Sequence, residues 1–417
     1  MNSGDYVRLR LAREELECTL LESYDPSVVL VKLSSGYNIG IPKDHILGSE
    51  VIRSGSVEKK SVPLVQKKGL PSIGLVMTGG TIASKLDAKT GGVNSITNVS
   101  EFARFYPKLF EKVNVKRLDV PFMILSENMG SREWIKIAES VQTILDDPSI
   151  RGVVITHGTD TLHYTAAALS FFLRDLKKPV VLTYSQRSSD RASSDAELNL
   201  ECAARMALSD CAEVMIVGHA TLNDDFCYAL RGTKVRKTHT SRRDAFKPIN
   251  CEPLAKVWSD KVEMLSQFKA RNEGTGELDV TFNDKIALIK PYPGQTPDIL
   301  DYYRMHGYKG LVIEMFGLGH VPSGDAEHSW LSAIRKAVRE GLVICGASQT
   351  INGRLNPFVY STGREFEKTG VIFLEDMLAE TAFVKLGWVL GHRGWKEKAK
   401  EKMLENVAGE FNPLITA

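Results

Sequence analysis

The first fifty residues alternate apolar and polar side chains in short runs. A period of two over four to eight residues is typical of half-buried strands, and turn-forming residues such as Asp25-Pro26 separate the runs. The predicted strands are Tyr6–Leu11, Leu16–Leu21, Val28–Leu33 and Tyr37–Ile41. Because an open sheet of this size leaves two unpaired edges, we expect residues 1–53 to form a small β-barrel domain.

Residues 54–71 are rich in Ser, Lys, Gly and Pro, and this composition predicts a linker. After the linker, short apolar runs alternate with longer amphipathic stretches, which is typical of β-α-β units and a parallel sheet. The predicted strands are Ser72–Met77, Asn114–Val120, Gly152–Thr156, Pro179–Thr183 and Glu213–Val217, and the predicted helices are Arg132–Asp146, Asp160–Arg174 and Asp190–Leu208. This first α/β domain is expected to cover residues 72–260.

A polar, loosely patterned block at 261–284 is expected to connect to a second α/β domain at 285–417. Its predicted strands are Lys285–Lys290, Gly310–Phe316 and Leu342–Gly346, and its predicted helices are Ala326–Glu340 and Glu375–Leu390. The predicted fold class is therefore α/β, with mainly parallel sheets in two parts behind a small N-terminal β-barrel.

Composition narrows the class of protein. The chain has 417 residues, with 53 Lys and Arg against 51 Asp and Glu, so its net charge of +2 provides no overall field for nucleic acid. Six scattered cysteines without CxxC spacing predict neither a disulfide framework nor a metal site. No run of 18 apolar residues occurs, so we expect no membrane span and a cytoplasmic location.

The first segment with chemical potential follows the strand at Ser72–Met77. It reads Thr78-Gly79-Gly80-Thr81-Ile82, a glycine pair and then a threonine. Ligands of open α/β sheets bind beyond the carboxyl ends of strands, and a glycine pair permits a tight turn that presents Thr81 there. A plain turn in which Thr81 caps a helix is the alternative, and for this segment alone it is the more common structure.

The second segment follows the strand at Gly152–Thr156 and reads His157-Gly158-Thr159-Asp160-Thr161. Thr159 or Asp160 could simply cap the following helix. Two hydroxyl-rich strand ends in one sheet, however, favour a site in which a hydroxyl nucleophile is activated by a neighbouring base. The basic segment around Lys237 is, on its own, a solvated loop, a phosphate-binding patch or the location of a catalytic lysine.

TGGTI and HGTDT, in this order and each after an apolar strand, resemble the two signature motifs of the L-asparaginase family of amidohydrolases, which use a threonine nucleophile. The resemblance covers about Ile73 to Gly391. With the N-terminal domain and the segments SQTINGRLNPFVYSTGRE and ETAFVKLGWVLG, the whole chain resembles the family of D subunits of archaeal glutamyl-tRNA(Gln) amidotransferases.

The resemblance implies a role for each matching residue. Thr81 would attack the side-chain amide of glutamine or asparagine, and Thr159, Asp160 and Lys237 would transfer the protons. Substrate binding would fall to Ser126, Glu127, Gly80 and Gly158. The loop from Ser84 to Val93 lacks the tyrosine that many family members place there. We therefore hypothesise that hydrolysis is slow until the partner protein and charged tRNA order this loop.

The resemblance also implies the partners. Ammonia would pass to the E subunit of the amidotransferase, a kinase and transamidase that binds Glu-tRNA(Gln) and uses Mg-ATP, whereas this chain would bind no cofactor of its own. A homodimer through the asparaginase-like domain is implied as well. The alternatives are a free-standing L-asparaginase with an accessory β-domain and a binding protein with a vestigial site. Retention of Thr81, Thr159, Asp160 and Lys237 argues against the vestigial site.

Overall fold

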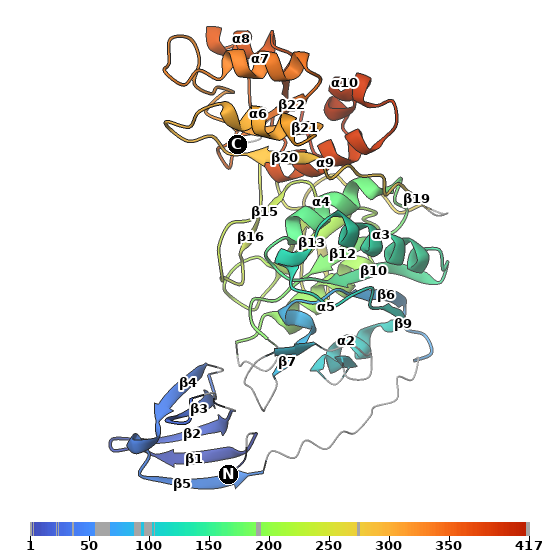
Figure 1. The fold of residues 1–417 in the computed structure, drawn as a ribbon. Helices are drawn as coiled ribbons and strands as arrows, with labels where there is room; N and C mark the ends of the chain where they lie inside the picture. Colours follow the sequence, from blue (N-terminus) through green and yellow to red (C-terminus); the bar gives the residue numbers. More distant parts are fainter. Residues whose placement is uncertain are drawn as a thin grey trace.

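A computed structural model describes the chain except for residues 1, 3, 22, 24, 36, 55–66, 87–92, 96–101, 104, 189–192, 273–275 and 414–417. Figure 1 shows three main sheets that follow one another along the molecule in chain order. The fold class is α/β as predicted, with an antiparallel N-terminal sheet and two mainly parallel sheets. Most of the predicted linker 54–71 and the middle of the loop after Thr81 lie outside the described residues.

The N-terminal sheet has five antiparallel strands in the order β4-β3-β2-β1-β5. The strands are β1 (Tyr6–Arg10), β2 (Glu15–Leu20), β3 (Val28–Leu33), β4 (Asn38–Pro42) and β5 (Gly48–Arg53), with the short 3-10 helix η1 (Lys43–His45) between the last two. Among the described residues β4 and β5 do not pair, so the expected closure into a barrel is not observed. Proline at the end of β4 and charged side chains on β5 protect these edges instead.

The central sheet has eight strands in the order β18-β17-β14-β13-β12-β10-β6-β9. Five of them run parallel: β6 (Ser72–Met77), β9 (Asn114–Asp119), β10 (Ile150–Thr156), β12 (Val180–Thr183) and β13 (Val214–His219). Three antiparallel strands extend the sheet: β14 (Cys227–Arg231), β17 (Ala255–Val257) and β18 (Val262–Met264). The predicted strands of this sheet are confirmed, and the sheet extends past residue 260.

Helices cover both faces of the central sheet (Figure 1). Alternate strand residues divide between two cores: Val76 and Ile155 pack with α3 (Ser131–Leu145) and α4 (Leu162–Phe172), whereas Leu75 and Val154 pack with α5 (Ala196–Ala207). The short α2 (Pro107–Lys112) joins the second core. Three two-stranded ladders flank the sheet: β7 (Ser84–Leu86) with β8 (Val93–Ser95), β11 (Leu173–Arg174) with β19 (Glu277–Leu278), and β15 (Val235–Lys237) with β16 (Phe246–Pro248).

The C-terminal sheet is parallel, with the order β20-β21-β22-β23. Its strands are β20 (Ile286–Ile289), β21 (Gly310–Met315), β22 (Val343–Ser348) and β23 (Ile372–Phe373), and its helices are α6 (Asp298–Met305), α7 (Leu331–Arg339), α8 (Ser361–Glu367), α9 (Ala379–Gly391) and α10 (Ala399–Leu404), with the 3-10 helix η4 (Lys396–Lys398) before α10. The helix predicted from Ala326 begins only at Leu331, because residues 323–329 form tight turns.

Helix α9 lies between the two parallel sheets and contacts α4 on one side and β21 on the other (Figure 1). The rings of Phe171 and Trp388 stack across the α4–α9 contact with centroids 5.7 Å apart. Residues of both α/β halves therefore belong to one continuous core. In the part of the chain that the structure describes, no helix is long and apolar enough to cross a membrane.

Candidate active site

The candidate site is located where β6 and β10 end. These strands are parallel neighbours, with Met77 beside Thr156, so their carboxyl ends meet at one edge of the sheet. The backbone N–H and the hydroxyl of Thr78 both donate to the Thr156 carbonyl, at 3.2 and 2.8 Å. This contact fixes the segment that leads to Thr81 against the segment that leads to Thr159.

The glycine pair makes the turn that the sequence predicts. Gly79 and Gly80 have φ angles of +125° and +81°, a backbone conformation that favours glycine. A β-carbon on Gly80 would lie 2.6 Å from the backbone of His157 and Gly158. The two motifs thus approach so closely that only hydrogen fits between them, and Thr81 begins the 3-10 helix η2 (Thr81–Ala83) directly after this contact.

Lys237 joins the residues of the second motif. Its Nζ lies 2.8 Å from Thr159 Oγ1 and 2.8 Å from Asp160 Oδ1. The Lys237 side chain is 12% exposed, whereas that of Asp160 is 61% exposed. The nitrogen is therefore largely enclosed and the carboxylate faces the solvent. This arrangement can move a proton from a partly buried hydroxyl toward the surface.

Ser126 lies in the 3-10 helix η3 (Ser126–Asn128), and its buried side chain supports the same loop. The backbone N–H of Asp160 donates to Ser126 Oγ at 3.1 Å, and the Thr161 hydroxyl donates to the Ser126 carbonyl at 2.6 Å. A β-carbon on Gly158 would lie 2.7 Å from Ser126 Oγ. Glu127 is exposed next to it. Among the described residues, the side chains of Thr81 and Glu127 make no hydrogen bond to the other predicted site residues.

Sequence reasoning did not assign a role to His157. Its Nδ1–H donates to the Gly158 carbonyl at 2.7 Å, and its Nε2 accepts from the Thr165 hydroxyl at 2.9 Å. Burial lowers the pKa of His157 to about 4, so the ring is neutral at pH 7. The neutral ring connects the loop that carries Thr159 to α4. In the sequence, the location of His157 directly after a buried strand was the feature that could have indicated this role.

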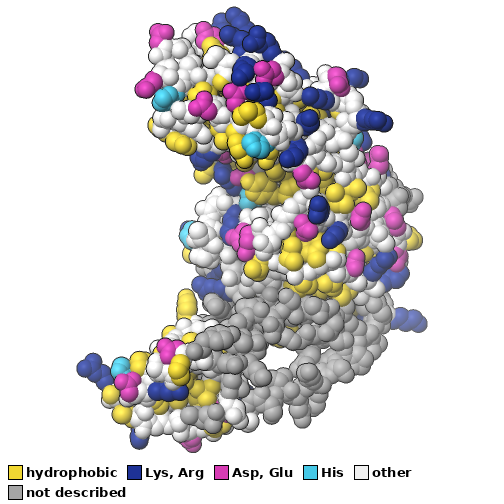
Figure 2. Space-filling model, in the orientation of Figure 1, with side chains coloured by type: hydrophobic (Ala, Val, Ile, Leu, Met, Phe, Trp, Pro, Cys, Tyr) yellow, Lys and Arg dark blue, Asp and Glu magenta, His cyan; other side chains and the backbone are white. Residues whose placement is uncertain are grey.

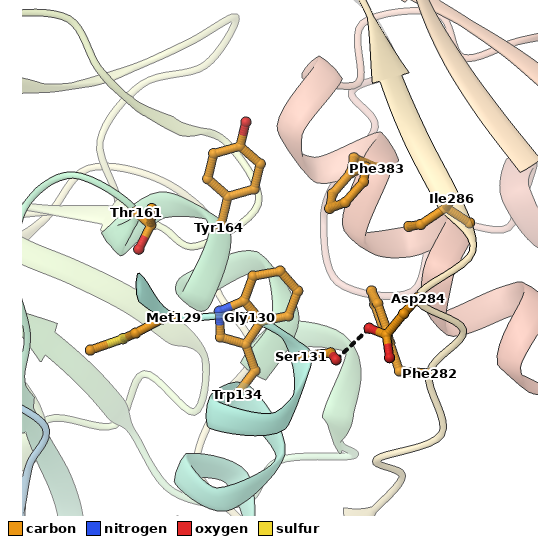
Figure 3. A pocket seen from close by; sticks show the side chains of 10 residues that line it. All are labelled: Met129, Gly130, Ser131, Trp134, Thr161, Tyr164, Phe282, Asp284, Ile286 and Phe383. Carbon is orange, nitrogen blue, oxygen red and sulfur yellow. Dashed lines mark hydrogen bonds between the residues drawn. The ribbon is translucent and has the colours of Figure 1, made fainter. Parts of the chain in front are cut away.

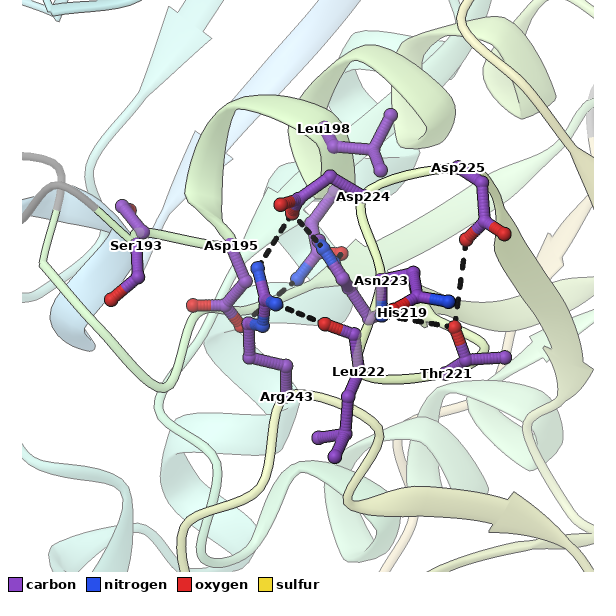
Figure 4. Close-up of polar contacts among 12 residues, drawn as sticks. Ser193, Asp195, Leu198, His219, Thr221, Leu222, Asn223, Asp224, Asp225 and Arg243 are labelled. Carbon is purple, nitrogen blue, oxygen red and sulfur yellow. Dashed lines mark hydrogen bonds and ion pairs between the residues drawn. The ribbon is translucent and has the colours of Figure 1, made fainter.

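A second polar cluster, which the sequence did not predict either, lies at the ends of β12 and β13 (Figure 4). His219 contacts Asn199 Oδ1 through Nδ1 at 2.6 Å and Asp224 Oδ1 through Nε2 at 2.9 Å, and Arg243 pairs with Asp224 at 2.6 Å. Asp195 accepts the N–H of Arg187 at 3.0 Å, and burial raises the pKa of Asp195. This network fixes the start of α5 and the loop after β13 at the edge that carries the candidate site.

A cavity of about 280 Å³ opens beside the site, between the two α/β halves (Figure 3). Apolar and aromatic side chains line it, and Figure 2 shows hydrophobic side chains gathered at this junction. Ser131 donates a hydrogen bond to Asp284 across the opening. Met129 and Thr161, which line the cavity, directly follow the segments that carry Ser126 and Asp160, so the cavity adjoins the site without containing its polar residues.

Three family models match the chain. Residues 1–52 match the GatD N-terminal domain, residues 72–270 match asparaginase, N-terminal, and residues 285–404 match the glutaminase/asparaginase C-terminal domain. The two asparaginase models thus match the regions that carry the two motifs and the C-terminal parallel sheet.

Relatives match nearly the whole length. The chain is 48% identical to the D subunit of the glutamyl-tRNA(Gln) amidotransferase of Pyrococcus furiosus, over 98% of this chain and 95% of that protein. It is also 48% identical to the protein of the same name from Thermococcus kodakarensis, over 98% of this chain and 94% of that protein. Among solved structures, the thermostable L-asparaginase from Thermococcus kodakarensis matches with a TM-score of 0.73 and 27% identity, over 82% of this chain and 100% of that one.

Proposed function

The chain belongs to the family of glutamyl-tRNA(Gln) amidotransferase D subunits, and from this membership we propose that Thr81 is the nucleophile of its amidohydrolase reaction. The chain is a glutaminase/asparaginase-type subunit of the tRNA-dependent amidotransferase. The observation that supports the residue assignment is the contact of Lys237 Nζ with Thr159 and Asp160 at the sheet edge where the Thr81 turn lies.

The proposed chemistry begins with attack of Thr81 Oγ on the side-chain amide carbon of glutamine. Thr159 relays the hydroxyl proton to Lys237 in its unprotonated form, because a threonine hydroxyl is a weak nucleophile until a base removes that proton. Lys237 then gives this proton to the leaving nitrogen. The amide C–N bond breaks, and the nitrogen leaves as ammonia after it receives a proton. Water then hydrolyses the Thr81 ester, which releases glutamate and restores the hydroxyl.

Substrate recognition is assigned to the residues around this centre. Ser126 and Glu127 would bind the α-carboxylate and α-ammonium groups of the substrate, and the exposed carboxylate of Asp160 would share the ammonium. Gly80 and Gly158, where the two motifs meet, would line the same pocket. Asparagine has the same terminal groups, so both amides are candidate substrates.

The ammonia would be used by a second chain. We propose that a partner, the E subunit of the amidotransferase, binds Glu-tRNA(Gln), activates its glutamyl group with Mg-ATP and amidates it to Gln-tRNA(Gln), in the cytoplasm where charged tRNA is consumed. The asparaginase-like part would form the homodimer of the complex. This chain itself needs no cofactor for amide hydrolysis, because its proposed chemistry uses only side chains and water.

The test measures ammonia release from glutamine and from asparagine by the purified chain, alone and with the partner protein and Glu-tRNA(Gln). Thr81→Ala should abolish release in all mixtures, whereas Thr143→Ala, an exposed threonine on α3, should leave it unchanged. Strong stimulation by the partner and tRNA supports the amidotransferase function. Equal Thr81-dependent activity in every mixture would instead identify a free-standing L-asparaginase.

A further inference from the structure

The strand that carries Lys237 has little support of its own. Among the described residues, β15 pairs with β16 alone, over three residue pairs, and this ladder is separate from the eight-stranded sheet. Two-stranded ladders are at best marginally stable in water. The position of Lys237 at the candidate site therefore depends on contacts outside the ladder.

Side chains alternate between the two sides of β15. Val235 packs in the central core and Lys237 reaches Thr159 and Asp160. The other side presents Arg236 and, directly before the strand, Lys234, and both reach the C-terminal α/β half. A slip of one residue would exchange the two sides, so these contacts also define which residue faces the site.

Lys234 contacts Asp376, which precedes α9, and Arg236 contacts Glu380 in the first turn of α9. Lys234 Nζ lies 2.6 Å from Asp376 Oδ2 and 3.0 Å from the Asp376 carbonyl, and both side chains are fully buried. Arg236 Nε lies 2.9 Å from Glu380 Oε1, and the Glu380 side chain is only 8% exposed. Buried charges of this kind lose much of their interaction with water and are therefore fixed in place by their partners.

We propose that these two ion pairs, Lys234–Asp376 and Arg236–Glu380, hold β15 in place, so that the C-terminal α/β half positions Lys237 for amide hydrolysis. This inference rests on the proposed function. Arg236 and Glu380 are positioning residues, since neither contacts Thr159 or Asp160 in the structure. Rearrangement of α9 would move β15 and change the distance from Lys237 to Thr159.

The test compares Arg236→Gln and Glu380→Gln with Arg231→Gln, in the full chain with the partner protein and Glu-tRNA(Gln). Arg231 and Glu213 form a matched Arg–Glu pair, 2.7 Å apart and partly buried, between β14 and the residue before β13. We expect the two test variants to lower kcat for ammonia release by about 10-fold to 100-fold, because a small displacement of a catalytic group is costly. KM should change by less than about 3-fold, and Arg231→Gln should keep the kcat of the wild type.

Two further variants separate positioning from loss of stability. Arg236→Lys keeps the positive charge and should therefore have a higher kcat than Arg236→Gln. The double variant Arg236→Glu with Glu380→Arg restores an ion pair, so its kcat should be higher than that of Arg236→Glu or Glu380→Arg alone. Wild-type kcat in folded Arg236→Gln and Glu380→Gln would overturn the proposal. If Arg236→Gln does not fold, the nearly isosteric Glu380→Gln decides the question. Lys237→Met tests the proposed function separately, because full activity there would refute the role of Lys237 itself.

Discussion

Gly80 is required at the candidate site for two reasons, its backbone conformation and the lack of space for a side chain, and a comparison with Gly294 distinguishes them. The φ angle of Gly80 is +81° and a β-carbon would meet the backbone of His157 and Gly158, whereas Gly294 has a φ of +85° and open space around it. Both Gly→Ala changes should cost about 1 kcal/mol for the left-handed conformation. Gly80→Ala should in addition displace the Thr81 turn and lower ammonia release at least about 100-fold.

Ammonia release and thermal unfolding of the two glycine variants provide the measurement. Gly294→Ala serves as the control because it carries the same backbone cost at a distance from the site. Equal activity in the two variants would show that the approach of the two motifs is not needed for the reaction.

His163 should make the chain acid-sensitive. It is buried, and burial lowers its pKa to about 3, compared with about 6.5 in an unfolded chain. The unfolded state therefore binds more protons between these values, so the stability is complete above about pH 6.5 and is lost as the pH falls toward 3. From pH 7.5 to 4.5 this group should remove about 2 to 3 kcal/mol from the free energy of unfolding.

His163→Phe should remove this part of the pH dependence, because the ring lies against Tyr164 and Phe246 and its Nδ1 has no partner among the described residues. The measurement is denaturant unfolding at both pH values. His306→Phe, at an exposed position, should retain the wild-type difference. An unchanged difference in His163→Phe would contradict the prediction.

At the scale of elements, α3 packs closely on β6 because Gly74 of β6 has no side chain. A β-carbon on Gly74 would lie 2.2 Å from Ile144 Cγ2. Gly74→Ala should destabilise the chain by about 1 to 3 kcal/mol through overpacking. Because Ile144→Ala removes the obstructing methyl group, the double variant should lose less stability than the sum of the two single variants. Additive losses in denaturant unfolding would show that α3 adjusts elsewhere.

Elements with a clear period were predictable, and those that depend on distant contacts were not. The strand at Ser72–Met77 and the helix at Arg132–Asp146 follow from apolar spacing alone, and the structure confirms both within one residue at each end. The short strand β15 has no apolar period, since basic residues surround Val235. Lys234, directly before the strand, is buried only because it pairs with Asp376 far along the chain. The N-terminal sheet shows the same limit, since a pattern of strands does not reveal whether its edges close.

The candidate site was predictable only where local sequence defines it, and not where it depends on contacts between distant elements. Thr159, Asp160 and Lys237 were named from their motifs and the resemblance, and the structure brings their side chains together. His157 and the Arg236–Glu380 pair were missed because their partners are chosen by tertiary packing. Local spacing predicts which strand end carries a polar residue, but it does not predict which residue from another element meets it.

At the scale of the whole molecule, a second buried ion pair anchors the C-terminal segment. Lys385 Nζ lies 2.6 Å from Glu410 Oε1, and both side chains are fully buried. Burial lowers the pKa of Lys385, while Glu410 opposes the shift. Glu410→Gln should therefore destabilise the chain by about 3 kcal/mol, because it leaves a buried charge without its partner.

Thermal or denaturant unfolding checks this prediction. The double variant Lys385→Met with Glu410→Gln should recover much of the loss, because no unpaired charge remains. A loss in the double variant as large as in Glu410→Gln would contradict the argument. Lys108→Met is a control, because Lys108 pairs with Glu197 at the surface, where such pairs contribute little.

The place of α9 between the two sheets has a consequence for synthesis on the ribosome. Phe171 and the apolar side of α4 are covered by Trp388 and its neighbours, which are translated more than two hundred residues later. The first α/β half thus emerges with an uncovered apolar surface, and such surfaces promote aggregation of nascent chains. Chains that end before α9 should need chaperones to stay in solution, and completion of α9 should be the step that releases them.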